Sequence, residues 1–295
     1  MLLNSRTFLR CTSNKMIEIN NKSIGIFGCG WLGTALAKQL LRQNYNVYGT
    51  TQDEKKSQVL TNQGIKMQSF SLPLDTLIID KQPILKCPIV IICIPPNVRQ
   101  GKLDYADNIS LIVAAAEKAA VEKIILLSTT AIYGDLSGDL DETQVVMPLT
   151  NKATLLMEAE QHVLGFSQQG IVLRLAGLVG ETRHPGKFFK KNKVISLPNA
   201  QVNLVHQEDV IGIISQLLVS EVMTGVYNIA SKTHLSKHKF YSIATDALGL
   251  VAPSFDNHSL ENLGRKVLSD KIRQELNYQF IHDDLVAWLA KTSQC

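Results

Sequence analysis

Past residue 22, the sequence alternates short apolar runs with amphipathic segments, and this alternation constrains the fold more than any other feature. The run "CPIVIICIPP" (87–96) is continuous and rich in β-branched residues, which is typical of a strand buried on both faces. Segment 31–43 instead repeats its apolar residues at helical spacing. Strands separated by helices form right-handed βαβ units, so the pattern predicts an α/β fold with a doubly wound, Rossmann-type parallel sheet.

The expected strands, about seven, follow one another in the chain at 23–28, 46–50, 65–70, 87–96, 123–129, 170–177 and 225–230. Their expected order in the sheet is 3-2-1-4-5-6-7. The expected helices lie at 31–43, 53–63, 103–121, 150–168 and 208–219.

The alternation also predicts how the chain divides. Residues 1–21 are expected to be a disordered leader outside the fold. Residues 22–180 form the sheet domain, to which 207–230 returns, and 181–205 with 231–292 form a small lobe on the substrate side. Ligands of open α/β sheets bind beside the carboxyl ends of the strands, which is where we expect this lobe to pack.

Composition excludes several classes of protein. Apolar residues make up 45% of the 295, enough for a full core. The net charge of +4 is too small and too scattered for a nucleic-acid surface, and the longest basic run, 190–193, is interpreted as a solvated loop. No apolar stretch reaches the roughly 18 residues of a membrane span, so we expect no membrane partner.

The five cysteines form no Cys-x-x-Cys pair and are odd in number, which favours a reducing, cytoplasmic location with free thiols. Cys29 and Cys93 are interpreted as packing residues rather than nucleophiles. His234 and His238 share the spacing of a helix face but have no acidic or cysteine partner nearby in the sequence, so no metal site is expected.

One motif carries a specific ligand prediction. Gly28-x-Gly30-x-x-Gly33 follows the first strand and opens the first helix. There Gly28 permits a tight turn, Gly30 lets backbone approach a pyrophosphate, and Gly33 allows close packing of helix on strand. The helix N-terminus offers unpaired N–H groups to phosphate, so this context predicts a dinucleotide site rather than a bare turn.

The tip of the second strand bears on which dinucleotide is bound. NAD-binding proteins carry an acid about 20 residues after the glycines, whereas this strand ends in Thr50, Thr51 and Gln52. Two hydroxyls, an amide and the following Lys55–Lys56 pair favour NADP over NAD, although Asp53 and Glu54 lie between them. The expected cofactor contacts are Gly28, Cys29, Gly30, Trp31, Leu32, Gly33, Thr50, Thr51, Gln52, Ile94 and Pro95.

Four further segments accompany the glycine motif in order: "LLSTTAIYG" (126–134), "IVLRLAGLVGETRHPGKF" (171–188), "NLVHQEDVIGII" (203–214) and "GVYNIAS" (225–231). Together they resemble the extended short-chain dehydrogenase/reductase superfamily, which includes nucleotide-sugar epimerases and dehydratases. The closest likeness is to its atypical YeeZ-like group, and it spans about 23–290. The resemblance implies NAD(P), a small-molecule substrate of sugar type, and a homodimer formed through helices 103–121 and 150–168.

The resemblance also implies three catalytic groups: a Ser or Thr, a Tyr, and a Lys four residues after the Tyr. Thr129 matches the first group. The Tyr-x-x-x-Lys pair is absent, because Thr150 and Thr154 stand in its place and Lys152 points to nearly the opposite side of the helix. An aliphatic hydroxyl is a far weaker acid than a phenol, whose pKa is about 10, so Thr150 does not replace the tyrosine.

Other residues are candidates for the missing roles. Tyr133 is a candidate acid/base, with a structural or substrate-contacting role as the alternative. His206 is a second candidate, since imidazole titrates near neutral pH, with loop organisation as the alternative. Arg183 and His184 are candidates for holding an anionic group of the substrate, with a solvated loop as the alternative.

Three functions therefore stay open at this level. The chain could transfer hydride between NAD(P) and a carbonyl or carbinol, as an oxidoreductase or epimerase-like enzyme with an atypical site. It could instead be a non-catalytic NAD(P)-binding sensor or scaffold, which the missing pair favours. A fold relic that binds no cofactor is the third reading.

Overall fold

The computed structural model describes residues 22–70, 79–96, 103–147, 150–189, 194–221, 223–256 and 264–292. The predicted leader (1–21) and the basic run (190–193) lie outside the described residues. Within the described ranges, no helix combines the length and the hydropathy that crossing a membrane requires.

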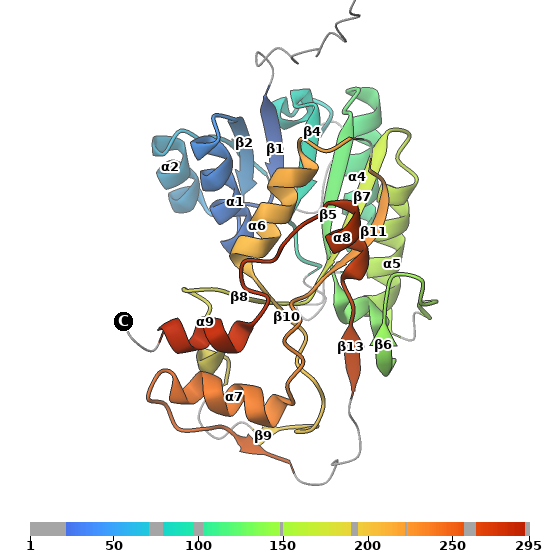
Figure 1. The fold of residues 1–295 in the computed structure, drawn as a ribbon. Helices are drawn as coiled ribbons and strands as arrows, with labels where there is room; N and C mark the ends of the chain where they lie inside the picture. The colour runs from blue at the N-terminus through green and yellow to red at the C-terminus, as the bar shows by residue number, and fades with distance from the viewer. Residues whose placement is uncertain are drawn as a thin grey trace, which may run out of the picture.

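A seven-stranded, all-parallel sheet forms the centre of the molecule (Figure 1). Its order, β11-β7-β5-β4-β1-β2-β3, is the predicted one. The strands are β1 (Ser23–Phe27), β2 (Asn46–Thr51), β3 (Lys66–Ser69), β4 (Ile89–Ile92), β5 (Lys123–Thr129), β7 (Gln169–Leu175) and β11 (Gly225–Ile229). The chain order reverses between β1 and β4, so the crevice for a ligand opens at their carboxyl ends.

Helices cover both faces of this sheet (Figure 1). On one side α1 packs against α6, and on the other α4 packs against α5. Asp53 caps α2 by accepting from the N–H of Lys56, and Thr150 caps α5 by accepting from the N–H of Ala153. The bounds are α1 (Trp31–Arg42), α2 (Glu54–Asn62), α4 (Tyr105–Lys118), α5 (Asn151–Leu164) and α6 (Gln207–Leu217).

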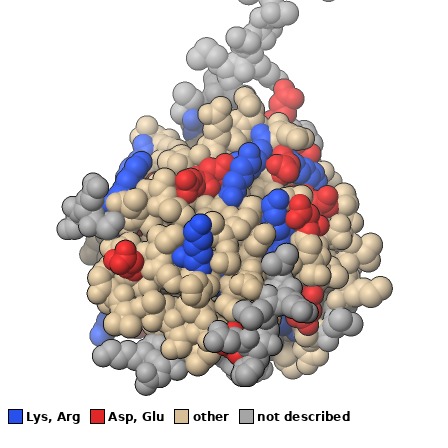
Figure 2. Space-filling view, turned by 60° about the horizontal axis from the view of Figure 1, so that its bottom comes forward, with Lys and Arg blue, Asp and Glu red and all other residues tan. Residues whose placement is uncertain are grey.

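A smaller lobe lies beyond the carboxyl ends of the strands (Figure 1). It contains η5 (Pro185–Lys187), α7 (Lys237–Asp246), α9 (Leu285–Thr292) and the strand pair β9 (Val194–Ile195) with β12 (Ser254–Phe255). It has its own apolar cluster, which includes Phe240, Leu285 and Trp288. Basic and acidic side chains are interspersed on the face that Figure 2 shows, where the visible Lys and Arg do not gather into one patch.

Two short parallel pairs join the lobe to the sheet domain. β8 (Gly177–Val179) pairs with β10 (Leu204–His206), and β6 (Gly138–Leu140) pairs with β13 (Arg265–Val267). After β13 the chain returns to the sheet, where α8 (Asp270–Glu275) packs against β11. Ile272 and Tyr278 consequently belong to the main apolar core, whereas the predicted division assigned them to the lobe.

Candidate functional site

A groove of about 430 Å³ opens at the reversal point of the sheet. Its walls come from the start of α1, the ends of β4, β5 and β7, and the segment after β8. Six of the predicted cofactor residues line it: Gly30, Trp31, Leu32, Gly33, Ile94 and Pro95. The groove therefore lies where a dinucleotide binds in this type of fold, and we call it the cofactor groove.

The glycines differ in what they do. Gly28 has φ +96°, a conformation that L side chains rarely adopt. A Cβ on Gly33 would lie 2.3 Å from the carbonyl oxygen of Gly28, so α1 packs on this turn only without a side chain there. At Gly30 a Cβ would meet no heavy atom within 4 Å, because the position faces open space. That open cradle fits the diphosphate of a dinucleotide.

The tip of β2 supports the glycine turn from behind. Thr50 is buried, its Oγ1 accepts from the N–H of Gly28 at 2.9 Å, and its carbonyl accepts from the N–H of Cys29 at 2.7 Å. Thr51 Oγ1 accepts from the N–H of Asp53. Lys56 Nζ lies 3.1 Å from the carbonyl oxygen of Gly30, so a positive charge stands beside the turn.

Cys29 packs inside this turn. Its side chain is buried, and burial raises the pKa of its thiol to about 11. Cys93 lines the cofactor groove, and burial raises the pKa of its thiol as well. Both thiols are protonated at neutral pH, so neither has the properties of an activated nucleophile.

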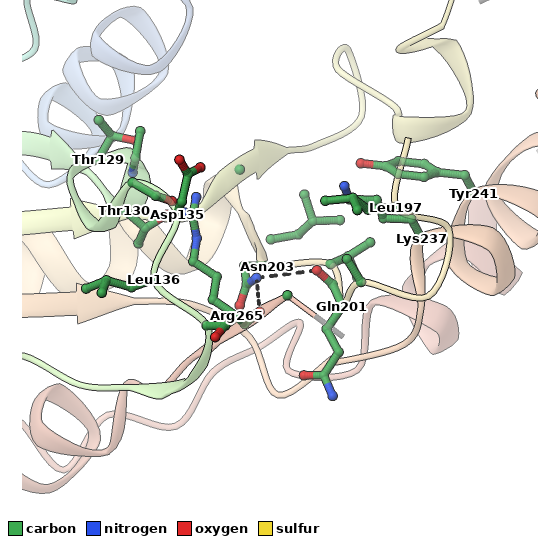
Figure 3. Close-up of a pocket in the computed structure, with 18 of the residues that line it drawn as sticks. Thr129, Thr130, Asp135, Leu136, Leu197, Gln201, Asn203, Lys237, Tyr241 and Arg265 are labelled. Atoms are coloured by element: carbon green, nitrogen blue, oxygen red, sulfur yellow. Dashed lines mark hydrogen bonds between the residues drawn. The ribbon is translucent and has the colours of Figure 1, made fainter. Parts of the chain in front are cut away.

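A second cavity, of about 610 Å³, adjoins the cofactor groove on the lobe side, and we call it the substrate cavity. Thr129 and Gly177 line both spaces, so the two meet at the end of β5 and the start of β8. Figure 3 shows Thr129, Thr130 and Asp135 on one side of it and Lys237 and Tyr241 on the other, with Arg265 and Asn203 between them.

Two cations define the electrostatics of the substrate cavity. Lys237 Nζ donates to the carbonyl of Ser196 at 3.2 Å, and burial together with the charge of Arg265 lowers its pKa. Arg265 Nη1 donates to the carbonyl of Gly134, and burial lowers its pKa while Asp135 opposes the shift. Two partly desolvated cations that repel each other make the cavity suited to an anionic group.

Apart from Thr129, the residues that line this cavity were not predicted from the sequence. Lys237 follows the helix cap Ser236, whose Oγ accepts from the N–H of Lys239, and that cap was the one readable signal. Arg265 comes from the short strand β13, for which no periodic pattern exists in the sequence. Arg183, which was expected beside the substrate, lines the cofactor groove and not the substrate cavity.

Tyr133 lies in η4 (Thr130–Tyr133) and lines neither space. Its side chain is 2% exposed, and its hydroxyl is 2.8 Å from Asn228 Oδ1 and accepts from Arg174 Nη1 at 3.2 Å. Burial raises its pKa, although Arg174 opposes the shift. The expectation of an acid/base role is wrong in this geometry, because the phenol is buried behind the loop and its hydroxyl is already engaged.

The hydroxyl of Tyr133 belongs to a buried polar network beneath the site. Arg174 on β7 forms an ion pair with Glu160 on α5, with Nη2 and Oε2 2.8 Å apart. Ser128 Oγ donates to Glu160 Oε1 at 2.5 Å. Since Ser128 directly precedes Thr129, this network holds the end of β5 in place.

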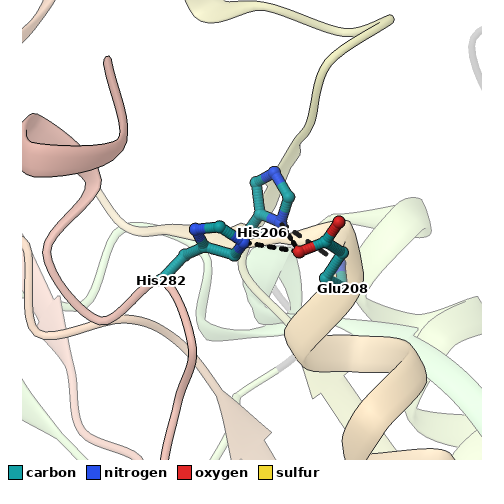
Figure 4. Close-up of side chains that lie close together, drawn as sticks. All are labelled: His206, Glu208 and His282. Carbon is teal, nitrogen blue, oxygen red and sulfur yellow. Dashed lines mark hydrogen bonds and ion pairs between the residues drawn. The ribbon is translucent and has the colours of Figure 1, made fainter. Parts of the chain in front are cut away.

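His206 and His184 organise the lobe. His206 is buried, and its Nδ1 accepts from the N–H of Glu208. The centroid of its ring lies 3.8 Å from that of His282 (Figure 4) and 4.9 Å from that of Trp288. Burial and His282 lower its pKa to about 4. His184 is also buried, and its Nδ1 accepts from the N–H of Gly186. Neither ring lines the groove or the substrate cavity, which contradicts the predicted substrate and acid/base roles.

His206, Glu208 and His282 bring three donor atoms within 4.8 Å of one another (Figure 4). Glu208 Oε2 lies 2.6 Å from His282 Nε2, the distance of a direct hydrogen bond or ion pair rather than of two ligands around one ion. The lone pair of His206 Nδ1 is taken by the backbone of Glu208. The donor set is therefore organised as a contact between α6 and the segment before α9.

Helix α5 does not supply the titratable pair that this superfamily uses. Thr150 is the helix cap, and Thr154 Oγ1 donates to the carbonyl of Thr150 at 3.2 Å. The one residue that α5 contributes to the cofactor groove is Leu156, an apolar side chain. Within the described residues, the groove thus lacks a Tyr–Lys pair on this helix.

The sheet order, the glycine turn and the cofactor groove define a Rossmann-type protein of the superfamily that the sequence resembles. Residues 26–230 match the NAD dependent epimerase/dehydratase family, and the chain belongs to that family. It is 32% identical to protein YeeZ of Escherichia coli (strain K12) over 274 residues, which cover 89% of this chain and 97% of YeeZ.

Solved structures share the fold at lower identity. UDP-glucose 4-epimerase of Thermotoga maritima, with UDP-glucose, has a TM-score of 0.75 at 14% identity, covering 92% of this chain and 97% of that one. The human epimerase family protein SDR39U1, with NADPH, has a TM-score of 0.72 at 16% identity, covering 92% and 99%. A functionally unknown conserved protein of Silicibacter pomeroyi has a TM-score of 0.72 at 20% identity, covering 93% and 99%.

Proposed function

We propose that this protein is an NAD(P)-dependent oxidoreductase or epimerase-like enzyme that transfers hydride between the nicotinamide and a carbonyl or carbinol. One observation carries the proposal. The cofactor groove and the substrate cavity meet at Thr129 and Gly177, so a substrate oxygen beside Thr129 would stand next to the cofactor. Binding two reactants in adjoining cavities is the arrangement that orients them for transfer.

NADP is the proposed preference over NAD. β2 ends without a carboxylate at the tip, where an acid would bind the ribose 2′-hydroxyl of NAD. Lys56 Nζ lies beside the glycine turn and would attract a 2′-phosphate. The human protein of similar fold was solved with NADPH, whereas the UDP-glucuronic acid 4-epimerase of Bacillus cereus was solved with NAD, so proteins of this fold bind either cofactor.

The proposed substrate is a small, sugar-like molecule with an anionic group. Lys237 and Arg265 supply the charge for that group, and the polar lining residues Asn203 and Tyr241 suit hydroxyls. The family likeness to a protein solved with UDP-glucose supports a substrate of this chemical type.

Thr129 is the proposed contact to the reacting oxygen. Its Oγ1 accepts from the N–H of Ala131 at 3.2 Å, which leaves its own proton to donate to a substrate oxygen. Tyr133 and His206 are both buried away from the substrate cavity. In the proposed reaction, the reacting oxygen therefore exchanges its proton with water or with another group of the substrate.

Binding and turnover test this function separately. Thermal shift with NADPH and NADH measures binding, since a ligand at 100 Kd adds about 2.7 kcal/mol to the stability of the folded state. Oxidation of NADPH is then followed over a panel of phosphorylated and carboxylated sugars and aldehydes. Thr129→Val should abolish turnover and preserve binding, while Thr61→Val, on the exposed side of α2, should change neither.

A non-catalytic NAD(P)-binding sensor or scaffold is the second candidate function. The observation that favours it is Leu156, an apolar side chain where α5 faces the cofactor groove. A sensor or scaffold should bind NADPH tightly, and no member of the substrate panel should oxidise the bound NADPH. A substrate whose turnover is abolished by Thr129→Val would exclude it.

Homodimer formation is also proposed, through α4 and α5, which pack side by side on one face of the sheet. The superfamily resemblance motivates this interface. Light scattering coupled to gel filtration measures the mass directly, and a monomer at micromolar concentration would contradict the proposal.

A further inference from the structure

The segment after β8 folds back onto the start of α1. Residues 180–183 form a tight turn, in which the N–H of Arg183 donates to the carbonyl of Gly180 at 2.9 Å. Trp31 Nε1 donates to Thr182 Oγ1 at 2.8 Å. A Cβ on Gly180 would lie 3.2 Å from the Trp31 ring, so the turn sits directly on that ring. We call residues 180–183 the clasp.

Arg183 ends the clasp and lines the cofactor groove together with Gly30 and Gly33. Its Nε donates to the carbonyl of Leu178 at 3.1 Å, and its guanidinium lies 5.7 Å from the Trp31 ring and 5.8 Å from the Phe188 ring. Among the described residues, no carboxylate forms an ion pair with it. The guanidinium of Arg183 is thus held in place by the hydrogen bond at Nε and by two aromatic rings. Its terminal N–H groups, at Nη1 and Nη2, are available to a ligand.

The start of α1, which lines the same groove, also favours negative charge. α1 begins without an acidic residue in its first turn and without a side-chain cap on Gly30. Its first N–H groups and the helix dipole favour an anion at that end. A guanidinium and a helix N-terminus that line one groove are together complementary to a diphosphate, whose oxygens can accept from both.

We propose that Arg183 binds the diphosphate of the cofactor and that the clasp, fixed to α1 by the Trp31–Thr182 hydrogen bond, closes the cofactor groove over it. This inference rests on the proposed NAD(P) binding and adds a residue from outside the glycine turn. It assigns to Arg183 a cofactor role in place of the substrate role that its sequence position suggested. The Phe188 ring, 5.8 Å from the guanidinium of Arg183, also lines the substrate cavity.

The test compares ligands with and without a diphosphate. NADPH and 2′-phospho-ADP-ribose contain it, and 2′-AMP does not; NADH, ADP-ribose and adenosine form the matched series without the 2′-phosphate. Calorimetry should show that Arg183→Ala weakens the two diphosphate ligands about 10- to 100-fold, the worth of a charge-assisted hydrogen-bond pair. Binding of 2′-AMP should change less than about threefold.

Three variants serve as companions. Arg183→Lys keeps the charge without the fork and should lose less affinity than Arg183→Ala. Thr182→Val removes the bond to Trp31 and should weaken NADPH severalfold. Lys187→Ala, an exposed cation four residues on that lines neither space, should bind NADPH like the wild type.

Fluorescence gives a second readout. Trp31 and Trp288 are the two tryptophans of the chain, so emission in a Trp288→Phe background reports Trp31 alone. NADPH should quench it, because the clasp holds the ring at the groove.

The outcomes separate the two proposals. If the wild type binds none of the dinucleotides, the proposed function fails and the clasp with it. If the wild type binds NADPH and Arg183→Ala binds it equally well, or loses affinity for 2′-AMP to the same extent, the clasp alone is wrong. If Arg183→Ala loses affinity for NADPH but not for 2′-phospho-ADP-ribose, Arg183 contacts the nicotinamide half of the cofactor and the diphosphate assignment is wrong.

Discussion

Arg174 and Glu160 meet behind the end of β5, with Nη2 and Oε2 2.8 Å apart and side chains only 9% and 3% exposed. The guanidinium also reaches the hydroxyl of Tyr133, and the carboxylate accepts from Ser128. One buried pair thereby joins β7, α5 and the loop that begins at Thr129. We therefore expect the Arg174–Glu160 ion pair to contribute to the stability of the fold and to hold Thr129 in position.

Breaking this pair on one side should be costly. Glu160→Gln leaves Arg174 buried without a counter-charge and should lower the free energy of unfolding by about 3 to 5 kcal/mol. The double variant Glu160→Leu with Arg174→Met should recover much of the loss. The exposed pair Lys118–Asp80, 2.9 Å apart, is the control, and Asp80→Asn should cost less than about 1 kcal/mol. Urea denaturation of the variants measures each value, and equal costs for both pairs would contradict the prediction.

The glycine turn offers a matched pair of substitutions. Gly33→Ala puts a Cβ 2.3 Å from the Gly28 carbonyl and should destabilise the fold by about 1 to 3 kcal/mol through overpacking. Gly30→Ala meets no protein atom within 4 Å and should fold with little loss of stability. Its methyl group would occupy the cradle proposed for the diphosphate, so NADPH affinity should fall while the melting temperature stays near that of the wild type. A Gly30→Ala protein with undiminished affinity would remove this cradle from the proposal.

Tyr133 should behave as a structural residue. Tyr133→Phe leaves Asn228 Oδ1 and Arg174 Nη1 with one partner fewer and should cost about 1 to 3 kcal/mol. On any substrate that the panel identifies, kcat should stay within a few-fold of the wild type. A fall of several orders of magnitude in kcat, with the fold intact, would restore Tyr133 as the acid.

Stability should fall on the acid side through His206. Its folded-state pKa of about 4 lies below the usual 6.5, so the unfolded chain binds a proton in this interval that the folded protein excludes. The stabilisation is complete above about pH 6.5 and is lost as the pH falls toward 4, on the order of 2 kcal/mol between pH 7 and pH 4.5.

His206→Asn keeps a residue that can cap α6. It should lower by about one the number of protons that the chain takes up on unfolding in this pH interval, and so reduce the slope of stability against pH. His184 and His234, whose pKa values burial also lowers, retain their share of the slope. His162, exposed on α5, provides the control substitution. Denaturant titrations at pH 7, 5.5 and 4.5 give the slopes, and an unchanged slope in His206→Asn would contradict the assignment.

The substrate cavity predicts a split in the kinetic constants. Lys237→Met removes a cation far from Thr129 on the opposite wall (Figure 3). For an anionic substrate KM should rise about 10- to 100-fold with kcat little changed, since the lost contact is the same in ground and transition states. The uncharged analogue of that substrate should show no such loss. Equal effects on both substrates would mean that Lys237 shapes the cavity and does not bind the anion.

The central sheet could be predicted because its evidence is local. Each buried strand is a continuous apolar run, each helix has its own period, and right-handed crossovers then leave few strand orders. The turn at Gly28 and Gly33 follows from the same logic, since its residues are consecutive and its steric needs are specific. Its support by Thr50 was expected as a cofactor contact, and the structure shows a hydrogen bond to Gly28 instead.

The substrate cavity could not be predicted because its residues converge from separate segments. Arg265, Lys237 and Asn203 come from β13, α7 and the residue before β10, and only tertiary pairing brings them together. The acid/base roles predicted for Tyr133 and His206 were wrong for a related reason. A titratable side chain near a motif looks reactive in the sequence, whereas burial and a committed hydrogen bond are visible only in the folded chain.

The two short pairings, β8 with β10 and β6 with β13, have a consequence for engineering. Residues 138–140 and 177–179 precede the lobe segments in the chain, yet they form strand pairs with the later residues 265–267 and 204–206, respectively. The lobe therefore cannot be exchanged for the lobe of another protein simply by joining the chains where they pass between the two parts. A chimaera that borrows a relative's substrate specificity must transplant all four strands together, or it will leave two half-ladders with unmatched backbone groups at the mouth of the site.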